Sequence, residues 1–86
     1  MKIKQHIINY LTYIFNNGIE IFKTSDIQNL SERSAKFAKR GRLGSPSTYE
    51  RTFRQLRQDG KITVQKQRLK KGGRQSSWKI KEIRND

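Results

Sequence analysis

The 86-residue sequence has no cysteine, one histidine and only seven acidic residues. Without cysteine, the chain can form neither a disulfide framework nor a thiolate metal site. The lone His6 and the scattered carboxylates give no metal-ligand spacing, no pair of acids and no nucleophile beside a base. We therefore expect a protein that is not an enzyme, has no metal, cofactor or small-molecule ligand, and uses His6 only on the surface or in packing.

Long hydrophobic runs are also absent. The longest apolar segment, residues 7–15, is interrupted by Asn9, Tyr10 and Thr12, so it has the character of neither a signal peptide nor a membrane span. We expect no membrane partner and a cytoplasmic location.

The charge is very uneven along the chain. The formal net charge is +13, but residues 1–32 contain three basic and three acidic residues and are neutral as a group. Residues 33–86 therefore carry the whole positive excess, which points to a polyanionic partner. The short length predicts one small domain, without room for a separate catalytic cleft of ordinary size.

The apolar residues of the first half fall in periodic clusters, which argues for a folded chain although only 31% of residues are hydrophobic. Four- and three-residue spacings predict an amphipathic helix over residues 3–17. A short alternating run predicts a strand over residues 19–22. Ser25 followed by Gln28 has the pattern of a capping box, so we expect a second helix over residues 25–39, either continuous or interrupted.

The sequence predicts a third helix over residues 45–59, with helix-capping residues at both ends. Ser45 is suited to the N-cap and Pro46 to the first helical position, and Gly60 supplies the left-handed residue that commonly follows the last turn. Helical spacing places one group of side chains on the stripe that faces the core. This group is Tyr49, Thr52, Phe53 and Leu56.

The opposite face of this helix is basic and rich in amides. Guanidinium groups pair bidentately with guanine edges or phosphates, and glutamine amides can pair with adenine, so this face has the chemistry to read a major groove. The alternative is a solvated face, because arginine and glutamine are also good helix formers. The face contains Ser47, Arg51, Arg54 and Gln58, flanked by Thr48, Glu50 and Gln55.

Period-two alternation predicts two strands in the C-terminal part, over residues 61–67 and 76–83. The segment between them, residues 68–75, is basic and contains two glycines, which predicts a hairpin with a cationic tip. We expect Trp78 to pack inward, with nucleobase stacking as the alternative. Residues 84–86 are expected to form a frayed tail.

The order helix, strand, helix, capped helix and basic hairpin resembles the winged helix-turn-helix superfamily. The segment Ser-Pro-Ser-Thr-Tyr-Glu-Arg-Thr-Phe-Arg-Gln-Leu-Arg-Gln-Asp-Gly-Lys-Ile is similar to the third helix and following strand of many winged-helix proteins. The resemblance implies an α+β fold with a small antiparallel sheet over residues 1–86. It also implies that helix 45–59 enters the major groove while the wing, residues 68–75, lies on the backbone or minor groove. The long basic segment before the third helix departs from the usual pattern.

From the residue types and this resemblance we expect a small double-stranded DNA-binding protein. Its role would be that of a transcriptional regulator or an accessory factor of a phage or mobile element, and it would associate with the nucleoid through DNA. The expected DNA contacts lie in three segments. They are Ser47, Thr48, Arg51, Arg54, Gln55 and Gln58 on the helix, Arg40 and Arg42 in the preceding loop, and Arg68, Lys70, Lys71 and Arg74 at the hairpin tip.

Two other functions stay open on the sequence. One is binding of RNA or single-stranded DNA, for which Tyr10, Tyr13 and Trp78 offer stacking surfaces. The other is a protein-interaction module that recruits a nucleic-acid enzyme. A homodimer or a DNA-assisted assembly is favoured slightly over a monomer, with Ile8, Tyr10 and Phe15 of the first helix as the partner surface.

Overall fold

The computed structural model describes residues 2–36, 41–67 and 77–84. In these residues the chain forms three α-helices, one 3₁₀ turn and a three-stranded antiparallel sheet, so the fold class is α+β. Their order is compatible with a winged-helix layout. The elements are α1 (Ile3–Asn16), β1 (Ile21–Lys23), α2 (Thr24–Arg33), η1 (Ser34–Lys36), α3 (Pro46–Gln58), β2 (Ile62–Gln67) and β3 (Ser77–Ile83).

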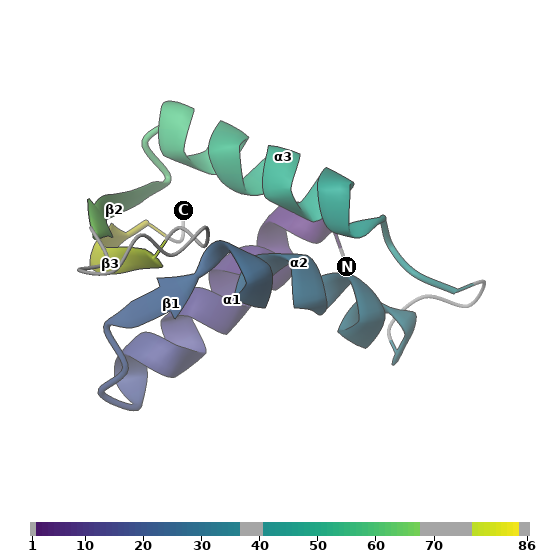
Figure 1. Cartoon of the computed structure of the whole chain (residues 1–86), viewed down its shortest axis with the longest axis horizontal. Helices are drawn as coiled ribbons and strands as arrows, with labels where there is room; N and C mark the ends of the chain where they lie inside the picture. Colours follow the sequence, from purple (N-terminus) through teal and green to yellow (C-terminus); the bar gives the residue numbers. More distant parts are fainter. Residues whose placement is uncertain (1, 37–40, 68–76, 85–86) are drawn as a thin grey trace.

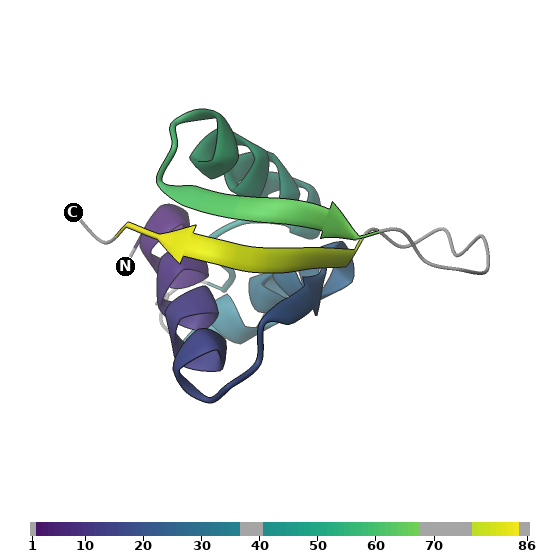
Figure 2. The same ribbon diagram turned by 90° about the vertical axis from the view of Figure 1, so that its left-hand side faces the viewer.

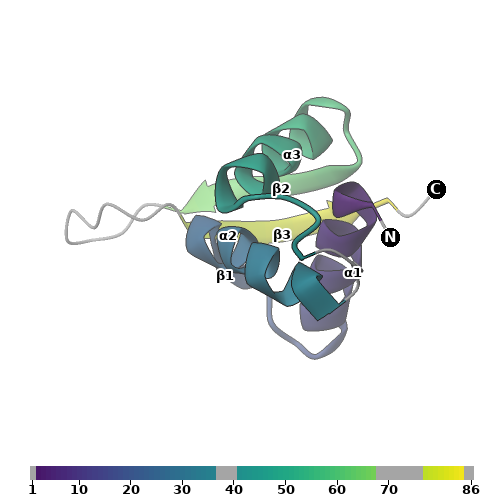
Figure 3. The same ribbon diagram turned by 90° about the vertical axis from the view of Figure 1, so that its right-hand side faces the viewer.

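The helices form one layer and the sheet the other. Figure 2 shows the sheet in front with the helices behind it, and Figure 3 shows the helices from the opposite side. The strand order is β1-β3-β2, so β3 is the central strand and pairs antiparallel with both neighbours. In Figure 1, α3 lies along one side of the molecule, and α1 and α2 lie together on the other.

The hydrophobic core lies between the two layers. Each helix contributes a stripe at helical spacing, and each strand contributes at least one side chain from its inner face. The buried hydrophobic residues are Ile7, Ile8, Leu11, Ile14, Phe22, Ile27, Leu30, Tyr49, Phe53, Leu56, Ile62 and Ile80.

The hairpin of β2 and β3 contains a bulge that period-two alternation did not predict. Ile62 pairs with Ile83 and Val64 with Ile80, and the register shifts between Thr63 and Val64. The extra residue on β3 lets Ile80 and Ile83, which are three positions apart, both pack against the core.

The predicted cap of the second helix is wrong. The helix begins at Thr24, with Lys23 as the N-cap, and the Lys23 backbone N–H donates to Asp26 Oδ2 at 2.9 Å. Asp26, at the third helical position, therefore supplies the carboxylate of the capping box, and its charge near the helix N-terminus also complements the helix dipole. Gln28 does not cap the helix but contacts α3, where its Nε2 donates to Glu50 Oε2 at 3.0 Å.

The second helix is also shorter than the predicted range of 25–39. The α-helix ends at Arg33 and continues as the 3₁₀ turn η1. Ser34 explains the tightening, because its Oγ donates to the Ser31 carbonyl at 2.5 Å and accepts from the Leu43 N–H at 2.8 Å. Residues 37–40 lie outside the described part of the chain.

The predicted strand 19–22 begins later, at Ile21. Gly18 has a φ of 82°, and the Ile19 N–H donates to the Ile14 carbonyl at 2.9 Å, so Ile19 completes the C-terminal cap of α1. The predicted frayed tail is wrong at Arg84, whose N–H donates to the Lys61 carbonyl at 2.8 Å.

Candidate nucleic-acid interface

The third helix begins and ends as predicted. The Ser45 Oγ accepts from the Thr48 N–H at 3.2 Å, and Pro46 occupies the first helical position. Gly60 follows the last turn with a φ of 74°, which an L side chain rarely adopts.

Aromatic contacts fix the rotation of α3 about its own axis. Tyr49, Phe53 and Leu56 are all buried. The Phe53 ring meets the rings of Phe22 on β1 and Trp78 on β3 edge-on, each with a centroid distance of 5.6 Å. Edge-to-face pairs at this distance are favourable and directional, so the helix cannot roll without losing both.

With its inner face fixed, α3 presents the predicted polar face to solvent. Ser47, Arg51, Arg54, Gln55 and Gln58 are all exposed. Neither Arg51 nor Arg54 forms a hydrogen bond or ion pair with another described residue. Both guanidinium groups therefore keep their donors available to a ligand.

Two predicted contact residues on α3 have partners within the protein. Thr48 is half-buried, and its Oγ1 lies 3.0 Å from the Ser45 Oγ, so it takes part in the helix cap. The Gln55 Nε2 donates to Asp59 Oδ1 at 2.9 Å. These short-range contacts engage the Thr48 hydroxyl and one donor of the Gln55 amide, so both residues are less available to a ligand than Arg51 and Arg54.

Arg57 is a residue that the sequence reasoning missed. It is half-buried, and its guanidinium carbon lies 4.8 Å from the Phe53 ring centroid and 4.3 Å from that of Trp78. Burial and the nearby Arg54 lower the pKa of Arg57, while Glu50 raises it. The spacing of four residues between Phe53 and Arg57 was the available signal, since such residues are neighbours on a helix.

Trp78 lies on the core side of the sheet. Its Nε1 donates to the Thr24 Oγ1 at 2.9 Å, and its ring contacts Phe53 and Arg57. The half-buried ring thus joins β3 to α2 and α3, as the prediction of inward packing required. Because the Trp78 ring is half-buried, less of it is accessible for stacking on a nucleobase.

A buried polar cluster, made of His6, Ser31, Ser34 and Tyr49, supports the start of α3. His6 Nδ1 and the Tyr49 hydroxyl lie 2.6 Å apart and share a hydrogen bond. The Ser31 Oγ donates to the carbonyl of Gly44, the residue before the Ser45 cap, at 2.5 Å. The cluster therefore connects α1 and α2 to the loop that leads into α3.

Burial also changes the acid–base properties of this cluster. It lowers the pKa of His6, and the positive charge of Arg33 lowers it further. Burial raises the pKa of Tyr49, and a hydrogen bond with Ser34 opposes that shift. Of the two expected places for His6, the surface or packing, the structure shows packing: the residue is 7% exposed and takes part in a buried hydrogen bond.

Some of the remaining predicted contacts lie within the described part of the chain and others outside it. Arg42 is exposed in the loop before α3. Gln67 and Ser77, the register partners at the wing end of the hairpin, are described. Five predicted contacts lie outside the described residues: Arg40, Arg68, Lys70, Lys71 and Arg74.

The predicted partner surface on α1 needs one correction. Ile8 is part of the hydrophobic core, because it lies on the face of α1 that packs against the rest of the molecule. Tyr10 is half-buried, whereas Phe15 is exposed, as are Ile19 and Ile21 beyond the helix.

Within residues 2–36, 41–67 and 77–84, no three His, Cys, Asp or Glu side chains are grouped closely enough to hold a metal ion. None of the helices in this described part combines the length and hydrophobicity needed to cross a membrane. Comparisons with protein-family models, curated proteins and solved structures find no match to this chain.

Proposed function

We propose that this protein binds double-stranded DNA by placing the outward face of α3 in the major groove. The observation that carries the proposal is the pair Arg51 and Arg54, which project from a helix whose inner face is fixed by Phe53. A major-groove reader needs side chains with forked donors on a rigid element. The resemblance to winged-helix proteins supports the same assignment.

The charge distribution supports the second part of the proposal, which is contact with the DNA backbone. The whole excess of +13 belongs to residues 33–86, the region that contains α3 and both strands of the hairpin. We propose that the wing, residues 68–75, adds contacts to the backbone or minor groove beside the recognition helix.

The biological role that fits a small basic DNA-binding protein is transcriptional regulation or accessory work for a phage or mobile element. A homodimer or a DNA-assisted assembly is part of this proposal, because many DNA-binding folds use two copies on two-fold sites. Sedimentation with and without a duplex measures this stoichiometry. A monomer in the absence of duplex together with a single copy per duplex contradicts the proposal.

Duplex binding by the double variant Arg51→Ala/Arg54→Ala tests the proposal. A specific contact is worth about 1–3 kcal/mol, so losing two weakens affinity at least about thirtyfold. The matched control is Lys81→Ala/Arg84→Ala, which removes the same charge from exposed positions near and just beyond the C-terminal end of β3. At the same ionic strength, the control is expected to lose much less affinity than the α3 variant.

Three outcomes are informative. A large loss for the α3 pair and a small loss for the β3 pair support groove binding. Equal losses contradict it, because binding would then depend on net charge alone. Undiminished duplex binding by the α3 variant also contradicts it and points to an interaction module whose basic face meets another protein.

A further inference from the structure

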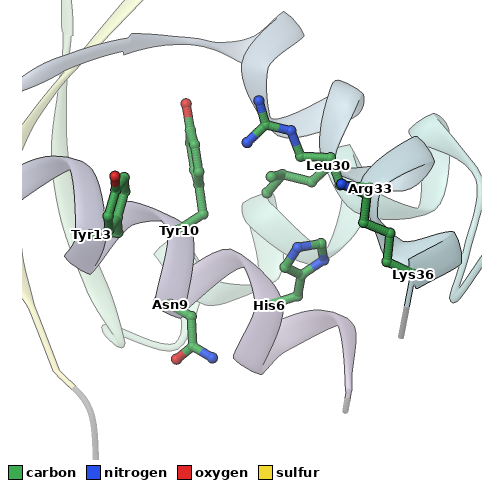
Figure 4. A pocket seen from close by; sticks show the side chains of 7 residues that line it. All are labelled: His6, Asn9, Tyr10, Tyr13, Leu30, Arg33 and Lys36. Carbon is green, nitrogen blue, oxygen red and sulfur yellow. The ribbon is translucent and has the colours of Figure 1, made fainter. Parts of the chain in front are cut away.

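A hollow of about 420 Å³ lies between α1 and α2. Figure 4 shows two tyrosine rings standing along α1 and two cationic side chains extending from the opposite wall. Its floor is deeply buried, whereas Tyr13 at its rim is 68% exposed. The lining residues are His6, Asn9, Tyr10, Tyr13, Leu30, Arg33 and Lys36.

The proposed DNA-binding face does not use this groove. Within the described part of the chain, its lining residues belong to α1, α2 or η1, and none belongs to α3. Whatever binds there can therefore be separated experimentally from a duplex bound on Arg51 and Arg54.

The side chains in the groove match the two chemical parts of a nucleotide. Tyr10 and Tyr13 are three residues apart on one helix, so their rings lie on the same side, and aromatic rings are the usual stacking surfaces for unpaired bases. Arg33 and Lys36 are exposed on the opposite wall, where their charge suits a phosphate.

The charges around the groove are mixed, and the positive ones lie on the wall formed by Arg33 and Lys36. Burial and the carboxylate of Asp26 raise the pKa of Tyr10, while Arg33 lowers it, so Asp26 and Arg33 both act on this ring. The Asp26 Oδ2 accepts a hydrogen bond from the Lys23 N–H, which orients the carboxylate but keeps its negative charge, so the phosphate is placed at Arg33 and Lys36 and away from Asp26. Arg33 and Lys36 form no hydrogen bond or ion pair with a described residue.

A nucleotide fits the lining better than an acidic peptide does. Peptides that dock between helices bury aliphatic or aromatic anchors in an apolar floor, but among the described residues that line this groove Leu30 is the single aliphatic one. Asn9 adds an amide, and its Oδ1 accepts from Gln5 at 2.7 Å, which leaves its amide nitrogen to donate to a base edge.

We propose that the groove between α1 and α2 binds an unpaired nucleotide of a nucleic-acid strand. The base stacks on Tyr13 and Tyr10, and the adjoining phosphate binds Arg33 and Lys36. This second site goes beyond duplex binding and does not depend on it.

Fluorescence anisotropy with a short labelled oligothymidylate tests the proposal. Tyr13→Ala is expected to weaken this binding about five- to hundredfold, because one stacked base is lost. The matched control is Phe15→Ala, another exposed aromatic residue on the same helix but outside the groove lining. It should change oligothymidylate affinity less than twofold by the same reasoning.

Tyr13→Ala and Arg51→Ala/Arg54→Ala are then each titrated with a duplex and with the oligothymidylate. Tyr13→Ala is expected to keep the duplex affinity of the unmodified protein, whereas Arg51→Ala/Arg54→Ala is expected to lose duplex affinity and keep oligothymidylate binding. Failure of one proposal is thereby separated from failure of the other. Thermal unfolding of each variant verifies that the exposed substitutions leave the fold intact.

Three results overturn the groove proposal. Equal weakening by Tyr13→Ala and Phe15→Ala removes the stacking role. Equal loss of duplex and oligothymidylate binding by Tyr13→Ala shows that the groove is not a separate site. Displacement of the oligothymidylate by a glutamate- and phenylalanine-containing peptide, from the unmodified protein but not from Tyr13→Ala, assigns the groove to an acidic peptide instead.

Discussion

The first 32 residues and the rest of the chain contribute differently to the same small fold. Of the twelve buried hydrophobic residues in the described part, seven lie before residue 33, although this region has no net charge. The later region supplies five and carries the whole excess of +13. The neutral region therefore supplies most of the hydrophobic core, and the cationic region supplies the excess positive charge.

The comparison also separates the exposed surfaces by chemistry. The exposed large hydrophobic residues of the described chain are Tyr13, Phe15, Ile19 and Ile21, and all of them belong to the neutral region. The exposed arginines of α3 belong to the cationic one. The α3 face that we assign to a duplex belongs wholly to the cationic region, whereas the groove that we assign to an unpaired nucleotide combines tyrosines of the neutral region with Arg33 and Lys36 of the cationic one.

The sharpest contrast within the cationic region is between the two faces of α3. Phe53→Ala removes a fully buried ring that contacts Phe22 and Trp78, so it is expected to lower the free energy of unfolding by about 3–5 kcal/mol. Arg54→Ala, one residue on, should change it by less than about 0.5 kcal/mol. Urea unfolding measures both, and similar losses would contradict the assignment of inner and outer faces.

The salt dependence of duplex affinity shows how much of the binding comes from phosphate contacts of the cationic region rather than from base contacts. If about six of its cations each neutralise a phosphate, duplex affinity falls about a thousandfold between 50 and 200 mM salt. Lys81→Ala/Arg84→Ala, near and just beyond the C-terminal end of β3, should leave the slope nearly unchanged. A salt-independent affinity would show that the charge excess does not contact the backbone.

The buried polar cluster connects the neutral region to the cationic one through His6 and Tyr49. Removing this hydrogen bond therefore tests how much it stabilises the contact between the two regions. Tyr49→Phe removes the hydroxyl that lies 2.6 Å from His6 Nδ1 and is expected to cost about 1–3 kcal/mol of unfolding free energy. Phenylalanine keeps the ring packing, so the loss reports the hydrogen bond. An unchanged free energy of unfolding would mean that the cluster does not hold α1 and α3 together.

Of these tests, mild acid is expected to change the free energy of unfolding least, through protonation of His6 in the buried polar cluster. Burial and Arg33 hold the pKa of His6 below its ordinary value of 6.5, so below about that pH the unfolded chain takes up a proton more readily than the folded one. Stability is therefore complete above the unfolded pKa and falls as the pH drops through the window beneath it. Urea unfolding at neutral pH and near pH 5.5 measures the fall, and His6→Gln should reduce it; an equal fall in this variant would assign the effect to carboxylates.

The third helix was predictable because its signals are local. Ser45, Pro46 and Gly60 mark its ends, and helical spacing assigns Tyr49 and Phe53 to the core. The same spacing identified the exposed arginines. Local capping chemistry and periodicity were sufficient there because tertiary contacts agree with them.

The features that escaped prediction depend on contacts between distant segments. His6 meets Tyr49 across 43 positions and Trp78 meets Thr24 across 54, and no spacing rule pairs such residues. The early end of α2 depends on Ser34 accepting from Leu43 nine residues later. The groove between α1 and α2 was not predicted either, since Tyr13 and Arg33 come together only when the two helices pack.

Selection of duplexes from a random pool at physiological salt tests the central claim most directly, with the unmodified protein and Arg51→Ala/Arg54→Ala side by side. The account predicts that the unmodified protein enriches a sequence motif and that the variant loses the enriched positions, because we propose that those arginines contact base edges. The same motif recovered by both proteins would contradict it, and so would a flat pool from both.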